Sequence, residues 1–142
     1  MLKKICIVII GICLVMAGSL CAHRYYNYGT FFAKKVAVDR NNWKTVLINN
    51  EHYLDKEYKP KCVKLANGAK VSKRIYHHLQ SMFNDARKQG ISITVGSGYR
   101  SWEEQNALWK KEMNRLDEKG VSLRDAIKRG ELVVQRPGMS EH

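Results

Sequence analysis

The sequence predicts an α+β fold, and three local patterns carry this prediction. Apolar residues recur at helical spacing over 71–89, and the stretch 91–95 alternates apolar and polar residues as a half-buried strand does. Ser101 and Glu104 then stand at the spacing of a capping box, which predicts a second helix over 102–119. The order helix, strand, helix indicates a mixed domain.

Capping and turn residues predict where these elements end. Ser72 can cap the first helix, and Gly90 supplies its C-terminal stop. Gly120 ends the second helix in the same way. Ser122 opens a third, short helix that Gly130 ends.

The last part of the chain is expected to be extended and then to turn. Residues 132–134 are apolar and are predicted to be extended. Arg-Pro-Gly at 136–138 follows, and this rigid turn presents Ser140 and His142 at the end of the sequence.

An uncharged apolar run extends over residues 5–22, directly after Lys3 and Lys4. Such a run is either a short membrane span or a secretory signal. Leu20 disrupts both a small-x-small cleavage site and a lipoprotein signal at Cys21. We therefore favour an uncleaved single-pass anchor over a cleaved signal. In both cases we expect the rest of the chain to be extracytoplasmic.

The predicted organisation has three parts, namely an anchor or signal over 1–22, a stalk over 23–45 and one domain over 46–142. Three of the four cysteines lie in the apolar run, so Cys62 is alone in the domain. A single cysteine cannot build an internal disulfide framework. Because its neighbours show no activating arrangement, we interpret Cys62 as a half-buried structural residue.

The chain is strongly basic, with a formal net charge of +12, and every acidic residue lies at or beyond Asp39. A basic exported domain attracts anionic wall polymers and lipid headgroups. Nucleic acid is a less favoured partner because no zinc-finger spacing, helix-turn-helix pattern or RNA-binding signature accompanies the charge. A solvated basic surface is the simplest interpretation of most of these lysines.

Polar groups converge where the second helix begins, in Ser-Gly-Tyr-Arg-Ser at 97–101. Glycine lets the backbone turn sharply and approach a ligand closely. Arg100 has a planar donor fork that suits a carboxylate, and Gln105 lies about one turn into the helix. This arrangement predicts a carboxylate pocket. The alternative is a local ion pair between Arg100 and Glu104.

Two segments together, 97–101 with Gln105 and Pro-Gly-Met-Ser-Glu-His at 137–142, resemble VanY-type D-alanyl-D-alanine carboxypeptidases. These are zinc peptidases that trim peptidoglycan stem peptides. The resemblance extends over roughly 47–142. It implies the N-terminal half of a hedgehog/VanY-like zinc peptidase domain behind an N-terminal transmembrane helix.

The resemblance also implies roles for individual residues. His142 matches the first zinc ligand of the family, and Ser140 matches a serine near the substrate. Arg100 and Gln105 match positions that bind the terminal D-alanine carboxylate or stabilise the developing oxyanion, and Tyr99, beside them in the motif, is expected to bind the substrate as well. In the implied reaction, zinc polarises the scissile carbonyl and activates water.

The resemblance stops at His142, because the family's aspartate and histidine ligands and its general-base glutamate have no counterpart in this sequence. One ligand does not hold catalytic zinc, so we expect the chain as given to be inactive. We also expect a marginally stable domain, since its elements lack sheet partners. A non-catalytic, membrane-anchored cell-wall-binding protein is the alternative. Pentapeptide and tetrapeptide stems remain equally open as ligands.

Overall fold

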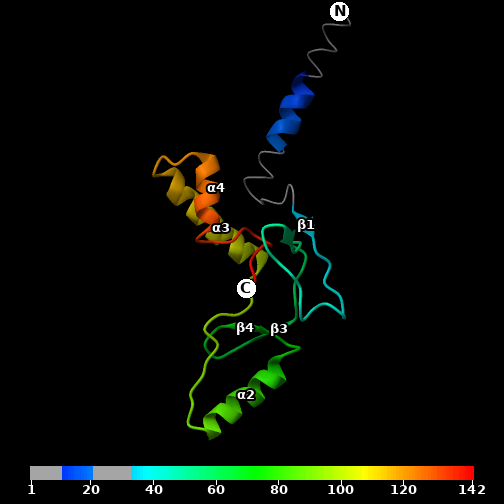
Figure 1. Ribbon diagram of the computed structural model, residues 1–142, viewed down its shortest axis with the longest axis vertical. Helices are drawn as coiled ribbons and strands as arrows, with labels where there is room; N and C mark the ends of the chain where they lie inside the picture. The colour runs from blue at the N-terminus through cyan, green and yellow to red at the C-terminus, as the bar shows by residue number, and fades with distance from the viewer. Residues whose placement is uncertain (1–10, 21–32) are drawn as a thin grey trace, which may run out of the picture.

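The computed structural model describes residues 11–20 and 33–142, and it combines short strands with longer helices as predicted (Figure 1). The labelled elements are β1 (Lys34–Lys35), β2 (His52–Tyr53), β3 (Cys62–Lys64), β4 (Lys70–Ser72), α2 (Tyr76–Lys88), α3 (Trp102–Asp117) and α4 (Leu123–Glu131).

The strands form two small sheets. β1 pairs with β2 in parallel, with Lys34 opposite His52, and β3 pairs with β4 antiparallel, with Cys62 opposite Ser72. The first pairing involves residues of the predicted stalk (23–45). Residues 34 and 35 lie within that stalk, yet their backbone hydrogen bonds join them to the domain.

The apolar core of the described residues lies between α3 and α4, which pack side by side (Figure 1). It consists of Trp109, Met113, Leu116, Ala126 and Ile127. On α3 these side chains recur at the three- and four-residue spacing of one helix face. Gly130 makes the close approach possible, because a Cβ at that position would overlap the end of Met113 and touch the ring of Trp109.

Helix α2 begins later than predicted. Residues 70–72 pair with β3 as strand β4, so the chain becomes helical only at Tyr76. Ser72 does not cap the helix; the N-cap is Ile75, and it makes no side-chain cap hydrogen bond. Gly90 does follow the helix end, with a positive φ of 74°. Helix α2 buries none of its residues and projects away from α3 and α4 (Figure 1).

The strand predicted over 91–95 is wrong, because these residues form no strand pairing with any other described part of the chain. Ile91 and Ile93 remain 52% and 41% exposed. A strand needs a partner for its backbone groups, and the alternating pattern alone supplies none. Missing sheet partners and low stability both stay predictions.

The extended stretch predicted over 132–134 is also wrong. The amide groups of Leu132 and Val133 donate to the carbonyl oxygens of Arg129 and Gly130, so the chain forms a turn at the end of α4. The end of a helix leaves unpaired carbonyl groups, and this turn satisfies two of them.

Residues 11–20 are helical and belong to the predicted anchor over 5–22, the rest of which lies outside the described residues. In the part of the chain that the structure describes, no helix has the length and apolar character needed to cross a membrane.

Candidate functional site

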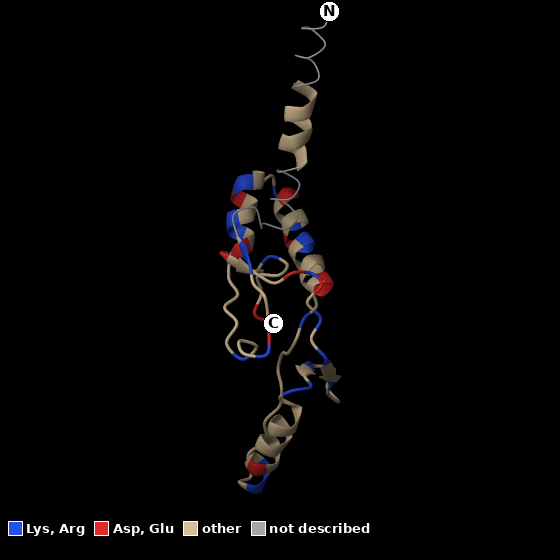
Figure 2. Ribbon diagram, turned by 90° about the vertical axis from the view of Figure 1, so that its right-hand side faces the viewer, with Lys and Arg blue, Asp and Glu red and all other residues tan. Residues whose placement is uncertain are grey.

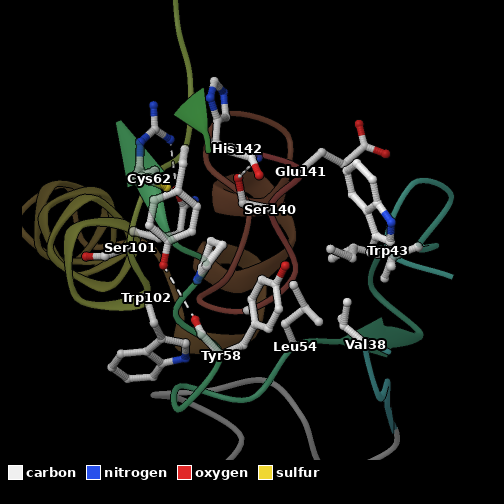
Figure 3. A pocket seen from close by; sticks show the side chains of 18 of the residues that line it. Val38, Trp43, Leu54, Tyr58, Cys62, Ser101, Trp102, Ser140, Glu141 and His142 are labelled. Carbon is white, nitrogen blue, oxygen red and sulfur yellow. Dashed lines mark hydrogen bonds between the residues drawn. The ribbon is translucent and has the colours of Figure 1, made fainter. Parts of the chain in front are cut away.

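All the predicted site residues line one cavity of about 360 Å³, which Figure 3 shows from close by. These residues are Tyr99, Arg100, Gln105, Ser140 and His142. They come from two segments that are about forty residues apart in the sequence. The remaining wall comes mainly from residues before α2, among them Trp43 and Tyr58.

The C-terminal segment is anchored to the core before it reaches the cavity. Pro137 and Met139 are fully buried. Arg136 is also buried; it pairs with Glu131 and lies over the ring of Trp109, with its guanidinium carbon 5.8 Å from the ring centroid. The predicted rigid turn is therefore present, and α3 and α4 hold it in place.

The turn at 136–138 contacts Leu54, just after β2, and this contact requires glycine at position 138. The φ of Gly138 is +80°, and its carbonyl oxygen accepts a hydrogen bond of 2.8 Å from the amide of Leu54. A Cβ at Gly138 would overlap the carbonyl oxygen of Leu54. Only glycine combines this backbone conformation with such a close approach.

The loop before α3 is held between β4 and the C-terminal residue. The amide of Tyr99 donates to the carbonyl oxygen of Lys70 at 2.7 Å, and the amide of Arg100 donates to the carbonyl oxygen of His142 at 2.9 Å. A Cβ at Gly98 would overlap the same Lys70 oxygen, so a side chain has no room there. The two sequence motifs are thus joined directly by a backbone hydrogen bond.

Arg100 does not pair with Glu104, which excludes the alternative considered from the sequence. The Glu104 carboxylate accepts a hydrogen bond of 2.7 Å from Lys70 Nζ and one of 2.7 Å from the amide of Ser101. The hydroxyl of Ser101 accepts from the amide of Glu104 in return, so the predicted capping box is confirmed. The Lys70 ammonium and the Ser101 amide together lower the pKa of Glu104.

Gln105 is buried, with 3% of its surface exposed, and both ends of its amide are engaged. Its Oε1 accepts a hydrogen bond of 2.8 Å from Arg100 Nη1, and its Nε2 donates to the carbonyl oxygen of Gln135. These contacts orient the guanidinium and tie it to the segment after α4. The amide of Gln105 is thus held between Arg100 and Gln135, and the contact with a ligand that the sequence suggested stays a prediction.

His142 is exposed at the edge of the cavity, and the side chain of Ser97 holds its ring. Nδ1 of His142 lies 2.9 Å from Oγ of Ser97, and the amide of His142 donates to Oγ of Ser140 at 3.4 Å. The side chain of Glu141 points away from those of Ser140 and His142 (Figure 3). The hydrogen bond at Nδ1 leaves Nε2 as the ring nitrogen for a metal.

The described residues do not assemble a zinc centre. No three His, Cys, Asp or Glu side chains among residues 11–20 and 33–142 come together so that they could hold a metal ion. His142 is a suitable first ligand, but catalytic zinc takes three protein ligands. The role of His142 as the first zinc ligand therefore stays a prediction.

Two further ionisable groups in the cavity remain neutral. Burial, followed by the influence of Cys62, raises the pKa of the Tyr99 phenol, and its hydroxyl donates to the carbonyl oxygen of Tyr58 at 3.5 Å. Burial also raises the pKa of the Cys62 thiol. A protonated thiol is a poor nucleophile, which agrees with the structural role predicted for Cys62.

The sequence did not predict three residues that shape the site. Lys70 neutralises Glu104, Ser97 orients the ring of His142, and Trp43 forms a wall of the cavity. Ser97 belongs to the motif at 97–101, so the sequence alone could have indicated that it lies at the site. Lys70 and Trp43 lie in segments without a motif, and only the fold brings them to the cavity.

Removing the Glu104 carboxylate should destabilise the start of α3. We expect Glu104→Ala to lower the free energy of unfolding by about 1 kcal/mol at neutral pH, because both the capping bond and the Lys70 pair are lost. The folded-state pKa of Glu104 is below the ordinary value of 4.5. The stabilisation is therefore complete above that value and is lost as the pH falls through the lowered pKa. Urea unfolding at neutral and acidic pH measures the difference.

Glu103→Ala is the matched control, since Glu103 occupies the same helical turn and forms no ion pair with a described residue. Its loss should be clearly smaller at neutral pH. Equal losses for the two variants would contradict the role given to the Lys70–Glu104 pair.

Comparisons with known proteins show which family the chain belongs to. Residues 68–142 match the family model described as "VanY: D-alanyl-D-alanine carboxypeptidase". A D-alanyl-D-alanine carboxypeptidase of Enterococcus faecalis (strain ATCC 700802 / V583) is 31% identical over 113 residues, which cover 80% of this chain and 42% of that protein. The chain thus spans less than half the length of this relative.

Two solved structures of VanY proteins are also similar. One is a mutant of a vancomycin resistance D,D-pentapeptidase VanY in complex with Zn(II), with a TM-score of 0.55 and 32% identity over 70% of this chain and 56% of that chain. The other is VanYB in complex with D-alanine-D-alanine, with a TM-score of 0.56 and 32% identity over 70% of this chain and 55% of that chain. The match over residues 68–142, which include every predicted site residue, shows that the chain belongs to the VanY family of D-alanyl-D-alanine carboxypeptidases.

Proposed function

We propose that the cavity binds the C-terminal D-alanyl-D-alanine of a peptidoglycan stem peptide, with Arg100 on the terminal carboxylate. The observation that carries this proposal is the arrangement around Arg100. Buried Gln105 orients the guanidinium at the cavity, while Lys70 engages the nearby Glu104 carboxylate. A guanidinium held in this way suits a carboxylate ligand with two parallel hydrogen bonds. The VanYB complex with D-alanine-D-alanine supports the choice of ligand.

The remaining polar groups suit the rest of such a dipeptide. The neutral phenol of Tyr99 and the hydroxyl of Ser140 line the same cavity as Arg100 and are both capable of donating and accepting hydrogen bonds. His142 lies at the edge of this cavity, and we propose it as the first zinc ligand. Removal of the terminal D-alanine is the activity that we propose for the family domain to which these residues belong.

Binding without hydrolysis is the second candidate function, and the surroundings of His142 favour it. His142 has no companion metal ligands among the described residues, so no hydrolytic step is assigned to them. An assay for D-alanine release from a D-Ala-D-Ala peptide, with Zn(II) supplied, separates the candidates. Release with one zinc bound per chain would contradict the expected inactivity, whereas binding without release would support a non-catalytic cell-wall-binding protein.

Arg100→Gln tests the ligand assignment directly. We expect the affinity of the full chain for D-Ala-D-Ala to fall about 10- to 100-fold, because a charge-assisted pair with a carboxylate contributes about 1.5–3 kcal/mol. Arg100→Lys should lose part of this affinity, because it keeps the charge and removes the planar fork. Isothermal titration calorimetry measures the three affinities.

Arg124→Gln removes the same charge from the exposed surface of α4 and should leave the affinity unchanged. If Arg100→Gln bound D-Ala-D-Ala as tightly as the unaltered chain, the assignment of the carboxylate to Arg100 would be wrong.

We further propose that the segment over 5–22 anchors the protein and that the domain faces the extracytoplasmic side. The two lysines before the apolar run and the cell-wall chemistry of the family support this placement. The net charge of +12 supports an additional attraction to anionic wall polymers.

A further inference from the structure

A second cavity, of about 530 Å³, adjoins the candidate site and has a strongly basic wall. Its cationic side chains belong to Arg40, Lys59, Lys61, Lys73 and Arg74, while Asp39 is its single acidic residue. The two cavities have five lining residues in common, namely Val38, Trp43, Tyr58, Pro60 and Ser72.

The fold collects these cations from three separate segments. Arg40 follows β1, Lys59 and Lys61 precede β3, and Lys73 and Arg74 follow β4. The β3–β4 pairing places Lys61 beside Lys73, and the amide of Lys73 donates to the carbonyl oxygen of Lys61 at 2.8 Å. Like charges side by side on paired strands destabilise a sheet. A bound anion would remove this cost.

No ion pair within the described residues neutralises the five cations. The Asp39 carboxylate is engaged by its own turn, where it accepts hydrogen bonds of 2.6 and 3.0 Å from the amides of Asn41 and Asn42. The guanidinium of Arg74 lies 4.8 Å from the ring centroid of Trp43, which fixes one cation on the shared wall.

Other basic residues of the chain differ from this cluster. Figure 2 shows lysine and arginine on helices and loops alike. Several of those outside the cluster have acidic partners, as in the pairs Lys35–Asp55, Lys70–Glu104, Lys88–Asp85, Arg115–Glu112 and Arg136–Glu131. A hollow lined by one sign of charge focuses the electrostatic potential and concentrates anions. The second cavity therefore has the electrostatics of a binding site.

We propose that this second cavity, the basic cleft, is an anion subsite that binds a carboxylate carried upstream on the same peptide whose C-terminus lies at Arg100. This inference rests on the proposed function. The shared wall of Trp43 and Tyr58 supports it, because these residues line both cavities and so place the cleft next to the cavity that contains Arg100. The site then distinguishes peptides with a free side-chain carboxylate from those in which that carboxylate is amidated.

The test compares peptides that end in D-Ala-D-Ala and carry glutamate at successive upstream positions, each with a glutamine twin. We expect the full chain to bind one glutamate peptide about fivefold more tightly than its twin, as two exposed ion pairs together contribute about 1 kcal/mol. The double variant Lys61→Gln/Lys73→Gln should abolish this difference and leave affinity for the D-Ala-D-Ala dipeptide unchanged. Lys110→Gln/Lys111→Gln removes the same charge from exposed positions on α3 and should keep the difference.

Equal binding of every glutamate peptide and its glutamine twin would overturn the proposal, and so would loss of the difference in the α3 control. Tighter binding of a glycerol phosphate oligomer than of any glutamate peptide would assign the cleft to a phosphate polymer instead and would also overturn it. If the dipeptide failed to bind but glutamate and glutamine peptides still differed, the proposed function would be wrong and the anion subsite would stand.

Discussion

Trp109→Ala is expected to lower the free energy of unfolding by about 4 kcal/mol, the largest loss that we predict for this chain. Trp109 is 1% exposed and lies at the centre of the core between α3 and α4. Its ring also supports the guanidinium of Arg136, which holds the C-terminal turn. Because that turn presents Ser140 and His142, the substitution should weaken ligand binding together with stability. Thermal unfolding and dipeptide titration measure the two effects.

Leu108→Ala is the matched control, since Leu108 precedes Trp109 on the same helix but is 39% exposed. We expect it to cost about 1 kcal/mol or less, because more than a third of the Leu108 surface already faces water in the folded state. A Trp109→Ala variant that unfolded like Leu108→Ala would show that the α3–α4 core does not carry the stability of the domain.

Gly98→Ala is expected to destabilise the chain by about 3 kcal/mol and to abolish binding at the candidate site. The added methyl group would overlap the carbonyl oxygen of Lys70, which is backbone and cannot turn aside as a flexible side chain does. Relief of the clash has to move the loop away from β4. The amide of Tyr99 then loses its bond to Lys70, and Arg100 leaves its place at the cavity.

Gly96→Ala offers a close comparison, because a Cβ at Gly96 meets nothing within 4 Å and its φ is not positive. This variant should keep both stability and dipeptide affinity. Urea unfolding and calorimetry on the two variants give the answer. Similar behaviour of Gly98→Ala and Gly96→Ala would contradict the close packing of the loop against Lys70.

Predictions from local patterns were confirmed where the interactions that form the structure join residues close together in the sequence. The capping box of Ser101 and Glu104 formed as predicted, since its hydrogen bonds join residues three apart. The turn at 136–138 and the stop at Gly90 depend likewise on the backbone preferences of proline and glycine. The resemblance then brought the five site residues together, and one cavity contains them all.

The predictions that failed concern pairing between distant segments. The alternation over 91–95 is a strand pattern without a partner, and residues 70–72 joined β3 although they continue a helical pattern. Backbone hydrogen bonds between strands depend on which segments meet, and no local window contains that information.

By itself, the sequence determined the family, the helices of the α3–α4 unit and the residue types at the site, because these follow from motifs and local spacing. Only the tertiary structure decided how those residues are used. In the folded chain, the Glu104 carboxylate pairs with Lys70 and the amide of Gln105 accepts a hydrogen bond from Arg100. A basic cleft without internal ion pairs among the described residues lies beside the cavity. The Lys70–Glu104 pair joins residues 34 positions apart, and the amide of Gln105 is fixed by Gln135, 30 positions further on. The cleft collects its cations from three separate segments. Packing and charge pairing between such segments override local preference.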